Sequence, residues 1–193
     1  MNICVFGASS DKLDEAFYTA AEELGGLIAK SGNTLVFGGG KGGIMGKCAM
    51  GAAACGGHII GIAPSFFDEP EILYKDSGEL IFTETMDERK QLMNEKSDAF
   101  IVLPGGLGTF DEFFGCLTQK QLGRHSKAVV LLDTLGYFEP LCALIDHSIQ
   151  MGFTGSDCHS LFAICKTPRQ VMEYLGNYVP VCGNTKRICD YAK

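Results

Sequence analysis

Two glycine-rich loops constrain the fold of this chain more than any other feature of its sequence. GGGKGGIMG occupies residues 38–46, and PGGLGT occupies residues 104–109. Each loop follows a short apolar run typical of a buried strand and precedes a segment with helical periodicity. A strand, a turn and a helix in that order form the unit from which parallel sheets are built. The two loops therefore predict an α/β fold.

The same order of strand, turn and helix recurs along the chain. We expect strands over residues 2–6, 34–37, 58–62, 79–83, 98–103, 128–132 and 161–165. We expect helices over residues 13–30, 44–55, 85–96, 110–122, 138–150 and 168–175. The alternation predicts a Rossmann-like three-layer fold, in which a parallel sheet has helices on both faces. A single domain would span residues 1–179, with a long loop over 64–78 near the active face and a C-terminal tail over 180–193 whose structure the sequence leaves open.

Charge and hydropathy narrow the range of partners. The net charge of −7 argues against broad binding to nucleic acid or anionic membranes, which depends on a basic surface. A small anionic ligand remains compatible, because helix N-termini supply local donors. No uninterrupted apolar run reaches the length of roughly 18 residues that suggests a membrane span, and the start MNICVFG lacks the features of a signal peptide. We therefore expect a soluble, cytoplasmic protein.

The cysteines and histidines do not suggest a metal or disulfide framework. The nine cysteines are odd in number, no pair has CxxC spacing, and most lie in apolar runs. Such cysteines act as small hydrophobic side chains in a reducing cytosol. The four histidines show no ligand spacing, so we expect no metal site.

The PGGLGT loop is the strongest candidate for a phosphate site. Glycines let the backbone approach a ligand closely, and free N–H groups at a helix start favour a phosphate. We expect Gly105, Gly106, Gly108 and Thr109 to hold it. One alternative is a tight turn without a ligand. A second alternative concerns Glu112: Thr109-x-x-Glu112 matches a capping box, and spacing alone favours that structural role.

The first glycine loop satisfies G-x-G-x-x-G through Gly38, Gly40 and Gly43, the pattern of dinucleotide sites. The match is weak, because a run so rich in glycine contains the pattern readily and no acid ends the next strand to bind a ribose. Lys41 precedes glycine, which excludes a nucleoside-triphosphate P-loop. We expect Gly38, Gly39 and Gly40 to form a second candidate phosphate loop in the same cleft.

The helix expected between the two loops carries a further candidate. Met86, Arg89, Lys90 and Met93 fall on one of its faces. An arginine between methionines is a poor fit to a fully solvated face, so Arg89 is a candidate site residue. The alternative, which the helix alone favours, is an arginine that extends from the helix edge to a nearby acid.

Taken in order, GGGKGGIMG, Met86-x-x-Arg89-Lys90 and PGGLGTFDE resemble the LOG ("Lonely guy") family. That family's hallmarks are GGGxxGLMG, an Arg-Lys pair in a helix and PGGxGTxxE. The resemblance implies a Rossmann-like fold and a homodimer or higher assembly. It also implies a hydrolase without a cofactor, which cleaves the N-glycosidic bond of cytokinin riboside 5′-monophosphates or AMP. The products would be the free base and ribose 5-phosphate.

The resemblance also implies roles for individual residues. Arg89 and Glu112 would form the catalytic pair, and the PGGLGT loop would hold the phosphate. Lys90 and Thr118 would contact the substrate, as would Glu71, whose Pro-Glu-Ile context matches the family less firmly. The surrounding loop departs from the family pattern, which leaves the base selectivity open.

Two rival interpretations accompany this one. Proteins of this kind are also described as lysine decarboxylases, but a pyridoxal-phosphate enzyme needs a Schiff-base lysine and an acid at the ring nitrogen. Lys127 lies just before a predicted strand, and no strand-end acid is placed to serve the ring. The other rival is a nucleotide-binding or sensing module without catalysis. The presence of both Arg89 and Glu112 favours an enzyme, since a passive phosphate site does not need a carboxylate beside an anion.

Overall fold

One sheet of seven parallel strands organises the chain, in the order β4-β3-β2-β1-β5-β6-β7. The computed structural model describes residues 1–67, 73–74 and 78–183. The strands are β1 (Asn2–Phe6), β2 (Thr34–Phe37), β3 (Ile59–Pro64), β4 (Glu79–Thr83), β5 (Ala99–Val102), β6 (Ala128–Leu132) and β7 (Ala163–Cys165). The strand order reverses between β1 and β5, and open parallel sheets bind ligands at the carboxyl ends of the strands beside such a reversal.

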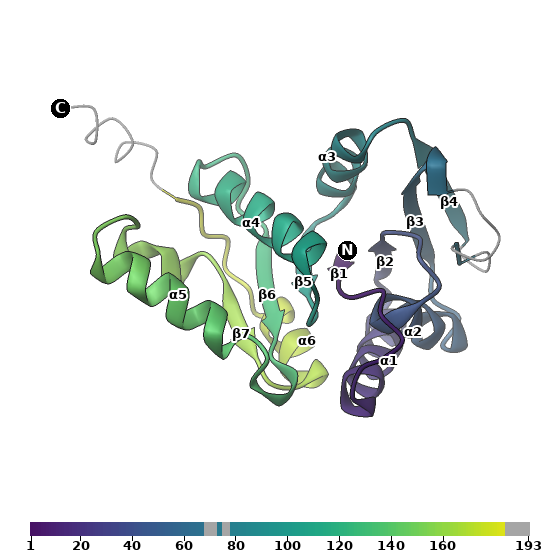
Figure 1. The fold of residues 1–193 in the computed structure, drawn as a ribbon. Helices are drawn as coiled ribbons and strands as arrows, with labels where there is room; N and C mark the ends of the chain where they lie inside the picture. Colours follow the sequence, from purple (N-terminus) through teal and green to yellow (C-terminus); the bar gives the residue numbers. More distant parts are fainter. Residues whose placement is uncertain (68–72, 75–77, 184–193) are drawn as a thin grey trace.

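Helices cover both faces of the sheet (Figure 1). One face carries α1 (Glu15–Lys30), α2 (Gly43–Ala54) and α6 (Pro168–Gly176), and the other carries α3 (Met86–Lys96), α4 (Leu107–Gln121) and α5 (Glu139–Gln150). Short 3-10 helices span Ser65–Phe67, Thr134–Gly136 and Ser156–Ser160. The predicted α/β fold, with helices on both faces of a parallel sheet, is confirmed.

Each face of the sheet has its own hydrophobic core. Side chains alternate along a strand, so Ile3 and Val5 of β1 enter the core under α1, α2 and α6, whereas Cys4 and Phe6 enter the core under α3, α4 and α5. The central strands are buried on both sides, which explains why their sequences read as continuous apolar runs.

The expected elements are present, with shifted ends. The helix expected to start at residue 110 begins at Leu107, because Gly106 is its N-cap. The eight cysteines in the described ranges are free thiols, and five of them are buried among the apolar side chains. None of the helices in the described part of the chain has the length and apolar character that crossing a membrane requires.

Candidate active site

The loops after β1, β2 and β5 meet at the carboxyl edge of neighbouring strands and enclose a cavity of about 610 Å³. The topology thus brings both glycine loops to one place, although the 57 residues 47–103 lie between them along the chain. The residues that line this cavity include Ser9, Ser10, Gly38, Gly40, Met45, Met86, Arg89, Lys90, Gly106, Gly108, Thr109, Asp111 and Glu112.

Arg89 and Glu112 form a buried ion pair in the cavity wall. Arg89 lies on α3 and Glu112 on α4, and Nη1 of Arg89 donates to Oε1 of Glu112 at 2.9 Å. Only 9% of the arginine side chain and 10% of the glutamate side chain are exposed. Nε of Arg89 also donates to the carbonyl oxygen of Ile62 at 3.1 Å. The alternative interpretation, in which Arg89 extends from the helix edge into solvent, is wrong because the side chain is buried. Its other part, that Arg89 pairs with an acid, is confirmed.

The surroundings of this pair shift the pKa of the Glu112 carboxyl group. Burial raises the pKa of Glu112 above its ordinary value, and the charge and hydrogen bond of Arg89 offset this only in part. The neighbouring carboxylate of Asp111 raises the pKa of Glu112 further. A perturbed acid paired with a cation in a cavity is a common feature of active sites, and structural ion pairs also produce it.

The capping interpretation of Glu112 is wrong. Helix α4 starts with Gly106 as its N-cap, so Thr109 already lies inside the first turn and caps nothing. The capping box of this region belongs to α3, where Thr85 accepts a hydrogen bond from the Glu88 amide at 3.1 Å and Glu88 accepts one from the Thr85 amide at 3.3 Å. Thr85-x-x-Glu88 and Thr109-x-x-Glu112 have the same spacing, and only the position of the helix start shows which of them is a capping box.

The start of α4 offers backbone donors to the cavity. No side chain caps Gly106, and within the described ranges no hydrogen bond outside the helix uses the amides of Leu107 or Gly108. Gly105 packs directly on Thr109, since a Cβ added to Gly105 would lie 2.1 Å from Oγ1 of Thr109. The first amides of a helix favour an anion, so this loop can hold a phosphate group.

The first glycine loop has a different set of contacts. At the start of α2 the Gly43 amide donates to Oδ1 of Asp11 at 2.8 Å, and the Ile44 amide donates to the Ala8 carbonyl at 3.0 Å. Gly38 is required for another reason: a Cβ there would lie 2.2 Å from Nη2 of Arg89. Gly38 therefore makes room for the arginine. Gly39 is not among the residues that line the cavity.

Lys90 lies at the edge of the cavity and is held by acids. Its Nζ donates to Oδ2 of Asp111 at 3.1 Å and lies 3.4 Å from Oδ1 of Asp87. The hydrogen bond to Asp111 raises the pKa of Lys90, which keeps the amine charged. Asp111 is a residue that the sequence analysis missed. Its partner is 21 positions away on another helix, so no local pattern pointed to it.

One of the residues expected to contact the substrate, Thr118, does not line this cavity. Thr118 lies on the exposed side of α4 and lines neither of the cavities at α3 and α4. Glu71 lies outside the described residues.

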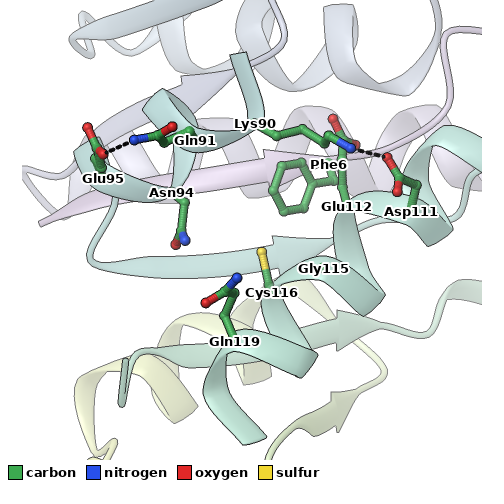
Figure 2. A pocket seen from close by; sticks show the side chains of 10 residues that line it. All are labelled: Phe6, Lys90, Gln91, Asn94, Glu95, Asp111, Glu112, Gly115, Cys116 and Gln119. Atoms are coloured by element: carbon green, nitrogen blue, oxygen red, sulfur yellow. Dashed lines mark hydrogen bonds and ion pairs between the residues drawn. The ribbon is translucent and has the colours of Figure 1, made fainter. Parts of the chain in front are cut away.

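A second cavity of about 450 Å³ lies between α3 and α4 and shares Lys90, Asp111 and Glu112 with the first (Figure 2). Asn94 and Gln119 extend into it from the two helices, and Oδ1 of Asn94 has no hydrogen-bond partner in the described part of the chain. Glu112 therefore stands in a wall common to both cavities. Within the described ranges, no three His, Cys, Asp or Glu side chains gather closely enough to hold a metal ion.

Comparison with known proteins identifies the family. A family model described as "Possible lysine decarboxylase" matches residues 45–175. The cytokinin riboside 5′-monophosphate phosphoribohydrolase of Mycobacterium tuberculosis (strain ATCC 25618 / H37Rv) is 44% identical over 151 residues, which cover 78% of this chain and 80% of that protein. The corresponding LOG2 enzyme of Arabidopsis thaliana is 36% identical over 178 residues, covering 92% of this chain and 84% of its own length. This chain belongs to the LOG family.

Solved structures outside these relatives share the LOG fold. The Moco carrier protein from Chlamydomonas reinhardtii aligns with a TM-score of 0.68 at 24% identity, covering 91% of this chain and 94% of that one. The molybdenum cofactor binding protein from Rippkaea orientalis aligns with a TM-score of 0.67 at 24% identity, covering 91% and 93%. At this identity the likeness concerns the fold alone.

The family model is described as a decarboxylase, but neither Lys127 nor Lys90 is placed to form a Schiff base. Lys127 lines neither cavity; its Nζ donates to the Asn94 carbonyl at 2.6 Å and lies over the ring of Phe100. Lys90 does reach the first cavity, but it is bound to Asp111. A Schiff-base enzyme needs a cavity lysine whose amine is free to react, and the ion pair with Asp111, which raises the pKa of Lys90, opposes that.

Proposed function

We propose that this LOG-family protein is a phosphoribohydrolase that acts on nucleoside 5′-monophosphates. It would cleave the N-glycosidic bond of cytokinin riboside 5′-monophosphates, AMP or both, and release the free base and ribose 5-phosphate. The observation that carries the proposal is the buried Arg89–Glu112 pair in the same cavity as the PGGLGT loop. The names of the relatives support the same class of hydrolase.

The 5′-phosphate of the substrate binds at the start of α4 in this proposal. The amides of Gly106 and Gly108, the hydroxyl of Thr109 and the positive end of the helix dipole all favour an anion there. Glu112 follows Gly106 by six residues, roughly 9 Å along the helix axis. A nucleotide anchored by its phosphate therefore presents its ribose to the Glu112 carboxylate.

The reaction breaks the bond between C1′ and the base nitrogen, and positive charge develops on the sugar. The carboxylate of Glu112 stabilises that charge and orients a water molecule. The water oxygen bonds to C1′, and the base leaves with the bonding electrons and gains a proton. Arg89 holds Glu112 in place and favours its ionised form. Binding of the remote phosphate positions the ribose for attack.

This hydrolysis is redox-neutral and uses only water, so we propose that no cofactor takes part. Lys90 supports the same substrate class, because Asp111 holds its charged amine at the cavity edge where it can contact a nucleotide.

The direct test is incubation with AMP, an N6-modified AMP and adenosine, followed by chromatography of the free base and of ribose 5-phosphate. We expect base and ribose 5-phosphate from the nucleotides and none from adenosine. Equal rates on AMP and adenosine would contradict the phosphate anchor. Free inorganic phosphate in place of ribose 5-phosphate would indicate a phosphatase. Nucleotide binding without any base release would favour the non-catalytic module.

We also propose that the active assembly is at least a homodimer. Thr118 matches a substrate-contacting position of the family, yet it lies on the exposed side of α4. Leu107 and Phe114 share that stripe of the helix and are 88% and 39% exposed. A second copy that covers this stripe would bury both apolar side chains and bring Thr118 to the partner's cavity.

A further inference from the structure

Tyr137 contacts the PGGLGT loop and is not among the residues that line the cavity. It lies at the end of the turn that follows β6, and its hydroxyl donates a hydrogen bond to the carbonyl oxygen of Gly105. The carbonyl of the preceding residue, Pro104, accepts a hydrogen bond from the Ala8 amide at 3.1 Å. Two successive carbonyls of the loop are thus held by groups from two other segments of the chain.

The direction of the Gly105 carbonyl also fixes the direction of the Gly106 amide. In a trans peptide the C=O and the following N–H lie in one plane and point in opposite directions, and no described peptide bond is cis. The Gly105 carbonyl points to Tyr137, which does not line the cavity, whereas Gly106 does. The amide hydrogen of Gly106 therefore points away from Tyr137, and Gly106 itself lines the cavity.

We propose that Tyr137 is a positioning residue, which fixes the Gly105–Gly106 peptide so that the Gly106 amide donates to the phosphate of the ligand. This inference rests on the proposed function, because it assigns a determinant of phosphate recognition to the same site. Without the hydroxyl, the peptide between two glycines has the conformational freedom to rotate away. Within the described ranges, no side-chain hydrogen bond caps Gly106.

The turn that carries Tyr137 is itself fixed. Leu135 adopts a φ of 56°, a left-handed conformation that residues other than glycine rarely adopt. The buried carboxylate of Asp133 stabilises the turn by accepting a hydrogen bond from the Phe138 amide at 2.7 Å. The Tyr137 ring packs edge-on against Phe17 of α1, with centroids 6.3 Å apart. Strained backbone that the surroundings enforce is found at functional sites, and here it places the hydroxyl before any ligand binds.

The test compares Tyr137→Phe with Tyr178→Phe. The first variant removes the hydroxyl and keeps the ring beside Phe17. The hydroxyl of Tyr178 also bonds backbone groups, including the Ser126 carbonyl, but Tyr178 lines neither cavity at α3 and α4. We expect Tyr137→Phe to weaken binding of ribose 5-phosphate and to raise the KM for AMP by about tenfold, with a smaller change in kcat. We expect Tyr178→Phe to change thermal stability, while the affinity for ribose 5-phosphate and the KM for AMP stay within about twofold of wild type.

A measurement on the wild-type protein tests the same point without a variant. Titration with ribose 5-phosphate, followed by NMR, should shift the amide resonance of Gly106 more than that of Gly115, further along α4. A Gly106 amide that does not respond, or a Tyr137→Phe protein with unchanged KM and ribose 5-phosphate affinity, would overturn the proposal. Failure of the wild type to cleave any nucleotide, with the Gly106 response intact, would refute the proposed hydrolysis alone.

Discussion

Nη1 of Arg89 and Oε1 of Glu112 lie 2.9 Å apart in the wall of a cavity that also contains the start of α4. The two side chains come from different helices on the same face of the sheet. An ion pair removed from water in this way costs desolvation energy that its mutual attraction does not always recover, so the pair is weak evidence of a purely stabilising role. The proposed catalytic role would account for the position of the pair beside the PGGLGT loop.

Glu112→Gln tests that role directly. A neutral amide cannot balance an oxocarbenium-like charge or act as a base, so we expect kcat to fall at least roughly a hundredfold. Binding of ribose 5-phosphate should persist, because the donors proposed for its phosphate are the loop amides and Thr109. Steady-state kinetics and calorimetry measure the two quantities.

The matched control for this experiment is Glu95→Gln. Glu95 is another glutamate of α3, which accepts a hydrogen bond from Gln91 in the second cavity, and we expect near-normal turnover of this variant (Figure 2). Arg89→Ala should also lose activity, and the Arg89→Ala/Glu112→Gln double variant should lose little more, as groups acting as a unit do. Near-normal turnover in Glu112→Gln would contradict the catalytic role of Glu112 and would require another acid in its place.

The pH dependence of activity gives a second prediction. Burial raises the pKa of Glu112, so the acid limb of kcat/KM should lie above the ordinary value of about 4.3 for glutamate. The charge of Asp111 contributes to that rise. Asp111→Asn removes a negative neighbour, which makes ionisation of Glu112 easier, and the limb should move to lower pH. A limb that stays in place or moves upward would contradict the assignment of Glu112 as the group that must be ionised.

A third prediction concerns Gly38, whose backbone lies against the guanidinium of Arg89. An alanine Cβ at this position would lie 2.2 Å from Nη2 of Arg89, so the guanidinium must shift away from Glu112. We expect Gly38→Ala to fold and to lose at least roughly tenfold in kcat/KM, since misplaced catalytic groups carry such costs.

Gly176→Ala is the comparison for that variant, because Gly176 ends α6 and does not line the cavity. Its new Cβ would meet no described atom within 4 Å. Both variants should have similar melting temperatures, and only Gly38→Ala should lose activity. Equal activities would show that Arg89 adapts without consequence.

The sequence predicted the sheet well because its signals were local. Short apolar runs between glycine turns and amphipathic helices define each β–α unit, and strands buried on both faces leave an unambiguous pattern. Helix ends were less predictable. Thr109-x-x-Glu112 and Thr85-x-x-Glu88 carry the same spacing, but the N-cap of α3 is Thr85 whereas that of α4 is Gly106, so only the Thr85 pair forms a cap.

The partners within the site could not be obtained from local patterns. Arg89 and Glu112 were each visible as candidates, but their pairing spans 23 residues and depends on how α3 and α4 pack against the sheet. The bond from Tyr137 to Gly105 spans 32 residues and joins two loops with no shared periodicity. Such contacts follow from strand order, which places the ends of β5 and β6 side by side.

The last prediction concerns the assembly and the exposed stripe of α4. Leu107, Phe114 and Thr118 lie on that stripe, and apolar side chains exposed in this way mark interaction surfaces when they are contiguous. We expect light scattering to give at least twice the mass of one chain. Phe114→Asp should reduce the mass to that of one chain and lower turnover, because Thr118 of the partner subunit would no longer reach the cavity.

Two further variants separate assembly from substrate contact. Thr118→Ala should keep the oligomer and raise the KM for AMP by about fivefold, the scale of one lost hydrogen bond. Val179→Asp, at a residue that is 74% exposed but lies after α6, should change neither mass nor turnover. A wild-type protein that is monomeric at working concentration yet fully active would refute the shared site. So would Thr118→Ala with an unchanged KM, because the stripe would then serve assembly alone.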